Sequence, residues 1–221
     1  SNDGRYVCFQ QNSFGNAFDV PAGTTPVVRA DLVEKKVEYR YNSFSTPGGN
    51  LSNHFQINPV YTNLVAFSHD YTSGWTTFHI LDRCNIMDFD TGEVISYNSG
   101  ILYDGRTEQM VTHEVWGMSG EHRWFSSWAT EGRQLHTGEL PAVVKIDKDG
   151  THRQYYRTMS GNSVHAGISG DEKMICCDFD IRLIATDTHQ VFQIVDLGPV
   201  VGSRNHPYHP HPHVSYTGNL A

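Results

Sequence analysis

Residues 113–126 read HEVWGMSGEHRWFS, and this stretch decides the fold class. A short apolar strand that begins with histidine leads into a polar turn and then into a second apolar strand. Further along, Lys145-Ile-Asp-Lys-Asp-Gly150 ends another strand in a turn whose residues tolerate positive φ. Helical periodicity is nearly absent, and short runs of Val, Ile, Tyr, Phe and Trp alternate with Gly, Asp and Asn turns. We therefore predict an all-β protein.

The clearest predicted strands share this β-branched and aromatic composition: Arg5–Phe9, Leu64–Phe67, Arg123–Ser126 and Lys173–Cys177. Tight turns are expected where Asp or Asn stands next to Gly or Thr-Gly: Asn2-Asp3-Gly4, Asp90-Thr91-Gly92 and Lys148-Asp149-Gly150.

The block recurs along the chain, and every copy begins with a histidine: His54, His113, His165 and His213. These histidines are 59, 52 and 48 residues apart, which fits the four-stranded antiparallel blade of a β-propeller. The repeats run approximately over residues 1–50, 51–109, 110–161 and 162–209, with a partial copy over 210–221. We predict a single β-propeller domain over residues 1–221, with about four blades present as part of a longer propeller.

The recurring histidines also predict a site. If the first strand of each blade is the innermost one, its histidine lies at the same height as the others around one central channel. Four imidazoles in phase would then provide metal ligands or acid–base groups. The alternative is that each histidine only satisfies hydrogen bonds at a strand edge.

The most specific signal is NHPYHPHPH over residues 205–213. The prolines between its last histidines restrict the backbone to extended conformations, in which His209, His211 and His213 share one face. Two imidazoles from this strand, together with His165, make a three-nitrogen face for a transition metal. A solvated loop of histidine and proline is the alternative.

Two further residues are candidates for chemistry. His113 is expected to act as a general base, and a structural histidine bonded to Glu114 is the alternative. Arg83 lies among apolar strand residues and is expected to hold a carboxylate with both arms of its guanidinium. Pairing with Asp82 or Asp88 is the alternative for this arginine.

Three residues are expected to bind substrate. His54 and Gln56 share a strand face in the alternating pattern and are expected to contact hydroxyl groups of a ligand. His69 follows the next strand and is a further candidate.

Composition and motifs exclude several functional classes. The chain has 221 residues, 38% of them hydrophobic, and a net charge of −8 without a cluster of Lys or Arg, so we expect no nucleic-acid partner. Its apolar runs are too short to span a bilayer, so we expect no membrane association. A Gly-x-Ser-x-Gly elbow, a P-loop and a zincin motif are all absent. An acidic protein that binds an anionic sugar must do so through a local cation, either an arginine or a metal.

The four cysteines, Cys8, Cys84, Cys176 and Cys177, match no zinc signature. We expect them to be buried free thiols, which favours a reducing compartment and hence a cytoplasmic protein. The chain opens with Ser1, so a lost signal peptide, and with it a periplasmic or secreted protein, stays open. The sequence leaves the oligomeric state open.

Several motifs stand in a defined order along the chain: Asn53-His-Phe-Gln-Ile-Asn-Pro59, Phe67-Ser-His69, Arg83, His113-Glu-Val-Trp116, His165 and His211-Pro-His213. In this order they resemble the oligogalacturonate lyases, which are seven-bladed β-propellers of the polysaccharide lyase class. The resemblance covers nearly the whole chain, although each motif is short.

The resemblance implies a divalent ion of the manganese type, held by three histidines and a glutamine. The three histidines fall on His165, His211 and His213 in this sequence. The resemblance also implies that His113 is the Brønsted base and that Arg83 binds substrate.

The fourth metal ligand departs from the family pattern. The family's glutamine lies three residues before the first histidine of His-Pro-His, where this chain has Tyr208. The position is therefore open to Asn205, His206, Tyr208, His209 or water. This difference leaves both the metal and the substrate open, and it indicates a divergent member.

These residues fit β-elimination from a 4-linked uronate. A base must remove the proton α to the carboxylate, and a metal ion and an arginine on that carboxylate would stabilise the developing charge. We therefore expect a metal-dependent lyase that cleaves an acidic oligosaccharide, with Mn²⁺ as cofactor. The alternatives are a non-catalytic propeller that binds carbohydrate or protein and keeps the metal site, and a lyase for a different uronate.

Overall fold

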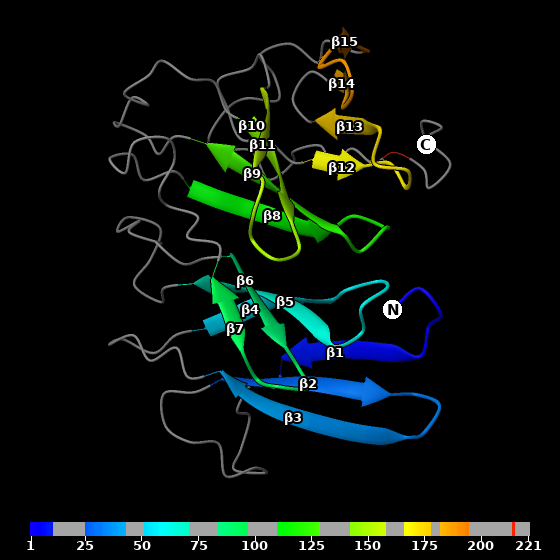
Figure 1. The fold of residues 1–221 in the computed structure, drawn as a ribbon, viewed down its shortest axis with the longest axis vertical. Coiled ribbons are helices and arrows are strands. Elements are labelled where there is room, and N and C mark those ends of the chain that lie inside the picture. The colour runs from blue at the N-terminus through cyan, green and yellow to red at the C-terminus, as the bar shows by residue number, and fades with distance from the viewer. Residues whose placement is uncertain are drawn as a thin grey trace, which may run out of the picture. The chain divides into compact units, whose positions relative to one another are not determined.

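The computed structural model describes residues 1–10, 25–42, 51–70, 84–96, 110–128, 142–157, 166–177, 182–194 and 214. Within these residues every regular element is a β-strand and none is a helix, which confirms the predicted all-β class (Figure 1). The chain divides into two compact units, Ser1–Ile101 and Leu102–Ala221, and each is described by itself. The single propeller domain stays a prediction.

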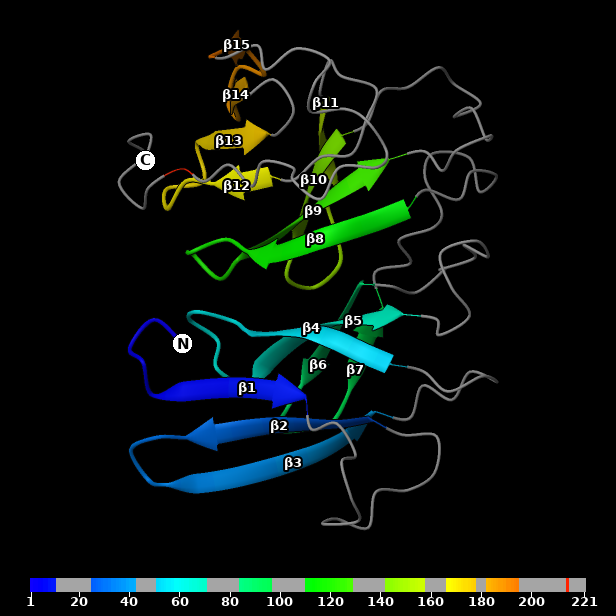
Figure 2. The same ribbon diagram turned by 180° about the vertical axis from the view of Figure 1, so that it is seen from behind.

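The first unit contains a three-stranded and a four-stranded antiparallel sheet. The three-stranded sheet consists of β1 (Tyr6–Gln10), β2 (Thr25–Asp31) and β3 (Lys36–Asn42). The four-stranded sheet consists of β4 (Leu51–Ile57), β5 (Leu64–Asp70), β6 (Cys84–Asp88) and β7 (Val94–Ser96). Strand β1 contacts β4, so the two sheets pack against each other (Figure 2).

The second unit contains two four-stranded antiparallel sheets, each with its strands in chain order. One consists of β8 (Met110–Trp116), β9 (His122–Trp128), β10 (Ala142–Asp147) and β11 (Gln154–Arg157). The other consists of β12 (Ala166–Ile168), β13 (Met174–Cys177), β14 (Arg182–Ala185) and β15 (Val191–Gln193). The strands predicted from sequence overlap with β1, β5, β9 and β13, and the repeating meander of four strands is the unit expected of a propeller blade.

Apolar side chains from both sheets meet in the core of each unit. In the first unit these are Val27, Val65, Phe67, Met87 and Phe89. In the second unit they are Trp124, Val143, Tyr156, Ile175, Cys177 and Ile184. Burial of a side chain the size of Val or Phe stabilises the folded state by about 1.5–3 kcal/mol, so the contact between sheets is the main stabilising feature of each unit.

The cysteines are free thiols, as expected, and three of them are buried: Cys84, Cys176 and Cys177. Cys8 is partly buried and packs beside the core of the first unit. Burial raises the pKa of the Cys8 thiol to about 11. The thiol therefore stays protonated at neutral pH and reacts poorly as a nucleophile.

The predicted tight turns are confirmed by the backbone of their glycines. Gly4, Gly92 and Gly150 have φ values of 68°, 79° and 84°. Glycine adopts this left-handed conformation without the steric penalty that a Cβ imposes. The turns at Gly92 and Gly150 connect antiparallel strands, and the turn at Gly4 leads into β1.

The turn that leads into β1 is held by three side-chain contacts. The hydroxyl of Ser1 donates to the Asp3 carboxylate at 2.6 Å and accepts from the amide of Tyr6 at 2.9 Å. The same carboxylate accepts from the amide of Arg5 at 3.0 Å. Serine and aspartate two residues apart thus satisfy backbone amides that the strands leave unpaired.

The turn between β12 and β13 has the same pattern of contacts. The hydroxyl of Ser169 donates to Asp171 at 2.7 Å and accepts from the amide of Met174 at 2.9 Å. Glu172 occupies the position that Gly4 occupies in the first turn, and it also has a positive φ, 58°. This repeated geometry supports the sequence repeat, and it places a glutamate where the backbone favours glycine.

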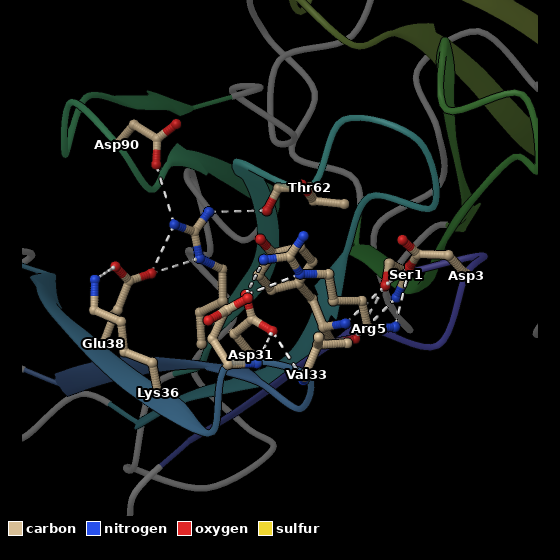
Figure 3. A network of polar contacts seen from close by, with 12 residues as sticks. Ser1, Asp3, Arg5, Asp31, Val33, Lys36, Glu38, Thr62 and Asp90 are labelled. Carbon is tan, nitrogen blue, oxygen red and sulfur yellow. Dashed lines mark hydrogen bonds and ion pairs between the residues drawn. The ribbon is translucent and has the colours of Figure 1, made fainter.

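An arginine of the first sheet holds the second sheet of its unit. The guanidinium of Arg29 on β2 donates to the Glu38 carboxylate at 2.8 Å, to the carbonyl of Thr62 at 3.1 Å and to Asp90 at 3.1 Å. It also lies over the ring of Phe89, 4.4 Å from its centroid. Figure 3 shows Glu38, Thr62 and Asp90 converging on this one guanidinium. We call Arg29 with these four partners the arginine clamp.

A second ion pair joins the residue before β1 to the end of β2, where the chain turns toward β3. Arg5 donates to one oxygen of the Asp31 carboxylate from Nε and Nη2, at 2.9 and 2.6 Å (Figure 3). The other oxygen accepts from the amides of Val33 and Glu34, both at 3.0 Å. The hydrogen bond from Arg5 is the main reason that the pKa of Asp31 lies well below its ordinary value.

Candidate functional site

The candidate site begins with a backbone irregularity that recurs in the first strand of two sheets. In β4 the pairing with β5 shifts between Asn53 and Gln56. In β8 the pairing with β9 shifts between Thr112 and Val115. Each shift is a β-bulge, because one strand contains an extra residue relative to its partner.

The histidine that begins each predicted repeat lies in this bulge. His54 has a φ of 52° and His113 a φ of 56°. Residues other than glycine rarely adopt the left-handed conformation, although histidine does so more often than most. Bulges of this kind change the direction of a side chain, and strained backbone of this kind is common at functional sites. The two described histidines of the predicted set are therefore structurally equivalent.

The residues after these two histidines are buried in different ways. Phe55 follows His54 and stacks on Phe67, with ring centroids 5.8 Å apart. Glu114 follows His113 at the equivalent position and is buried, with only 3% of its surface exposed, whereas Phe55 is partly buried. His113 itself is half-buried, whereas His54 is exposed. The bulge of the second unit thus combines a half-buried imidazole with a buried carboxylate. The sequence repeat alone did not show this difference between the two bulges.

The bulges have one further repeated feature, which sequence reasoning missed. Ser68 lies opposite Asn53, and Ser126 lies opposite Thr112, the residues directly before each bulge. Both serine hydroxyls are fully buried and have no hydrogen-bond partner among the residues that the structure describes. A Phe-Ser dipeptide at residues 67–68 and 125–126 is the sequence signal for this position.

The remaining predicted substrate-binding residues lie on the same sheet as His54. Gln56 is half-buried on β4, two residues after the histidine. His69 belongs to β5, where its backbone pairs with Ser52. His54 and Gln56 were predicted to share a face because side chains alternate along a regular strand. The bulge interrupts that alternation, so the shared face stays a prediction.

Most of the predicted metal and carboxylate site lies outside the described residues. This holds for Arg83, His165, Tyr208, His209, His211 and His213. Among the residues that the structure does describe, no group of three or more His, Cys, Asp or Glu side chains is arranged to hold a metal ion. The three-histidine metal site therefore stays a prediction. Its donor set, three neutral imidazoles, suits a transition metal.

The described part of the chain contains no helix long and apolar enough to cross a membrane.

No family model and no curated protein sequence matches the chain. Several solved structures are similar to it. An oligogalacturonate lyase in complex with manganese has a TM-score of 0.61 at 15% identity, over 86% of this chain and 47% of that one. A prolyl endopeptidase has a TM-score of 0.56 at 10% identity, over 80% and 27%. TolB from Acinetobacter baumannii has a TM-score of 0.50 at 12% identity, over 88% and 42%.

The chain spans less than half the length of each of these three structures. They include a lyase, a peptidase and TolB, so their similarity to this chain indicates a fold but not a particular reaction. Together with the antiparallel four-stranded sheets, they show that the chain has a β-propeller fold.

Proposed function

We propose that this protein is a metal-dependent lyase that cleaves short oligosaccharides of 4-linked uronates by β-elimination. The observation that carries the proposal is the pair of strained bulges that present His54 and His113 at equivalent positions. Two other histidines with positive φ, His152 and His189, lie in turns between strands, whereas His54 and His113 lie inside β4 and β8. Backbone strain inside a strand is common where a side chain has a chemical role. An oligogalacturonate lyase in complex with manganese shares the fold, so the proposed reaction is one that a propeller of this kind can accommodate.

In this proposal, His113 removes the proton α to the uronate carboxylate. A neutral imidazole accepts this proton at Nε2 or Nδ1, and a positioned general base contributes about 10²–10⁴-fold to the rate.

The substrate carboxylate needs cations, because the protein as a whole is acidic, with a net charge of −8. Arg83 would bind one edge of that carboxylate through two parallel N–H···O bonds. The imidazoles of His165, His211 and His213 would hold a divalent ion, Mn²⁺, which supplies Lewis-acid stabilisation of the developing negative charge when bound. His54, Gln56 and His69 would contact sugar hydroxyls.

The direct test is to incubate the full-length protein with oligogalacturonate and Mn²⁺ and to follow the ultraviolet absorbance of the unsaturated product. A His113→Asn variant is the informative control, because asparagine tolerates the left-handed backbone but is no base near neutral pH. We expect its kcat to fall by about 10²–10⁴-fold with little change in stability. A His152→Ala variant, which removes an exposed imidazole at the turn after β10, should keep normal activity.

A non-catalytic propeller that binds carbohydrate or protein is the second candidate. It is favoured by Tyr208, which stands where the resemblance implies a ligating glutamine, and by the likeness to TolB. A non-catalytic propeller would bind a uronate oligomer without cleaving it, and the His113→Asn variant would bind that oligomer with unchanged affinity. Absence of an unsaturated product from any uronate oligomer, with folded protein and bound Mn²⁺, would decide for this second candidate.

A further inference from the structure

The second unit contains a buried carboxylate that the proposed chemistry does not use. Glu172 lies in the turn between β12 and β13, and only 8% of its surface is exposed. Its φ of 58° belongs to the left-handed region, which favours glycine. At the equivalent position of the first unit, Gly4 has the same conformation, and a Cβ there would meet nothing within 4 Å. The turn geometry alone therefore does not require a glutamate.

Within the described residues, the partners of the Glu172 carboxylate come from the neighbouring sheet and its turn. One oxygen accepts from the hydroxyl of Ser119 and faces its amide nitrogen at 3.3 Å. The other oxygen lies 2.7 Å from Nδ1 of His122 and accepts from the indole nitrogen of Trp124 at 3.1 Å. Because a carboxylate only accepts, Nδ1 of His122 is assigned the hydrogen. We call Glu172 with Ser119, His122 and Trp124 the glutamate latch.

The neighbouring sheet also leaves room for this carboxylate. Gly117 directly follows β8, and a Cβ at this position would overlap the Glu172 carboxyl group. Any larger residue at 117 must therefore displace the glutamate. Gly117 and Glu172 thus form a matched pair, with space on one sheet and a charged side chain on the other.

The latch joins the ends of two first strands. Ser119 lies in the turn after β8, and Glu172 lies in the turn after β12, while His122 and Trp124 belong to β9, which β12 contacts (Figure 2). The bulged His113 is on β8, and His165 directly precedes β12 in the sequence. The relative position of β8 and β12 therefore bears on both proposed catalytic groups.

We propose that Glu172 is a positioning residue, which fixes β12 against β8 and β9. It so sets the position of the strand that follows the proposed metal ligand His165 in the sequence relative to the strand that contains the proposed base His113. This inference rests on the proposed function for its catalytic consequence. The latch itself is independent of that function, because its contacts lie within one unit and contain no substrate group.

A double-mutant cycle tests the latch without any assay of activity. Glu172→Gly removes the carboxylate and restores the residue that the turn favours, and Gly117→Ala displaces the carboxylate from the other side. We expect each variant to speed hydrogen exchange by about tenfold or more at β12 and at residues 119–122, and to shift Trp124 fluorescence. The double variant should resemble Glu172→Gly alone, because no carboxylate remains to clash with the new methyl group. Additive effects of the two changes would overturn the latch.

Lys173→Gln is the matched control, since Lys173 is exposed in the same turn and its side chain takes no part in the latch. It should leave both exchange and fluorescence unchanged. Loss of protection in Lys173→Gln equal to that in Glu172→Gly would also overturn the latch, because the turn as a whole would then be responsible.

The positioning role is tested by kinetics with oligogalacturonate and by calorimetry with Mn²⁺ alone. In Glu172→Gly we expect kcat to fall by about tenfold or more, with KM and Mn²⁺ affinity changed less than about threefold, since misplacement acts on the reacting geometry. Glu172→Gln, which keeps one acceptor oxygen for Ser119, should recover part of kcat. An unchanged kcat in Glu172→Gly would overturn the positioning role alone. An inactive wild-type chain would overturn the proposed function, and with it the positioning role, while hydrogen exchange would still decide whether the latch exists.

Discussion

Each unit joins two sheets, but the polar groups that make the join are opposite in charge and in setting. In the first unit the arginine clamp extends from a strand and ends at the rim of its neighbour, where Asp90 is 64% exposed. In the second unit the glutamate latch extends from a turn and ends in the interior, on the indole of Trp124. The clamp has a carbonyl, two carboxylates and a ring as partners, whereas the latch concentrates its contacts on one buried carboxylate.

The difference predicts how each junction responds to loss of a side chain. When the Arg29 guanidinium is removed, water can solvate the partners that it leaves at the surface. Exposed ion pairs also contribute little to the free energy of unfolding. Removal of the buried Glu172 carboxylate leaves the indole N–H of Trp124 buried without its acceptor, and such a donor costs about 1–3 kcal/mol. The second junction should therefore depend on a single side chain more strongly than the first.

The largest effect is expected in the apolar parts of the two junctions. Phe67→Ala and Trp124→Ala should each lower the free energy of unfolding by about 3–5 kcal/mol, because both residues are buried between sheets. Trp124→Phe separates packing from the latch, since it keeps a ring but loses the N–H that binds Glu172. Urea unfolding followed by circular dichroism measures these changes. If Trp124→Phe were as stable as wild type, the indole bond would not contribute to the junction.

The next effect concerns the latch itself. Glu172→Ala should lower the free energy of unfolding of the second unit by about 2–4 kcal/mol, because it removes the acceptor of the buried Trp124 indole and the contacts with Ser119 and His122, while keeping a Cβ in the left-handed backbone. Glu172→Gly should be less destabilising than Glu172→Ala by about 1 kcal/mol, since glycine relieves the backbone strain. Unfolding curves of the two variants, recorded under the same conditions, give this difference directly.

A smaller effect is expected at the clamp. Arg29→Lys should lower the free energy of unfolding by about 1–2 kcal/mol, because an ammonium group cannot serve Glu38, Thr62 and Asp90 in one plane or stack as well on Phe89. Lys36→Gln is a matched control, since the ammonium group of this exposed lysine makes an ordinary surface ion pair with Glu38 at 2.8 Å. Equal loss of stability in both variants would remove the distinction between the clamp and an ordinary surface ion pair.

The smallest effect is a dependence on pH confined to the first unit. Since the pKa of Asp31 is lowered from its ordinary value of 3.8 by Arg5, its carboxylate stabilises the folded state fully above that value. The contribution is lost as the pH falls below 3.8 toward the lower pKa of the folded state. Asp31→Asn should therefore show a shallower decrease of the urea midpoint below pH 4 than wild type. Parallel slopes would show that other carboxylates are responsible.

The hairpins and the repeat could be predicted from sequence because their signals are local. The turn at Asp90-Thr91-Gly92 needs a residue that tolerates positive φ, and the glycine in the sequence indicates this turn. The strands need only alternating or continuous apolar runs, as in Leu64–Phe67. Four strands to a repeat then followed from the spacing between His54 and His113.

The bulges and the latch could not be predicted, because both depend on which residues meet across strands or sheets. The shift at His113 is a property of the pairing between β8 and β9 and leaves no mark in either strand alone. Glu172 did carry a signal, a glutamate after Ser-x-Asp where the first unit has glycine, but its partners come from 48–53 residues away. The metal site was predicted from the order of histidines, and its ligands lie outside the described residues.

The bulged strands β4 and β8 also lie at the edges of their sheets. A regular edge strand offers a row of free amide and carbonyl groups on which another chain can add as a new strand, and this is a common start of aggregation. A bulge in the middle of such an edge strand interrupts that row, so a strand of another chain cannot pair with it along its full length. The same distortion that presents an imidazole would thereby help to keep the molecules of this protein from polymerising through their open edges.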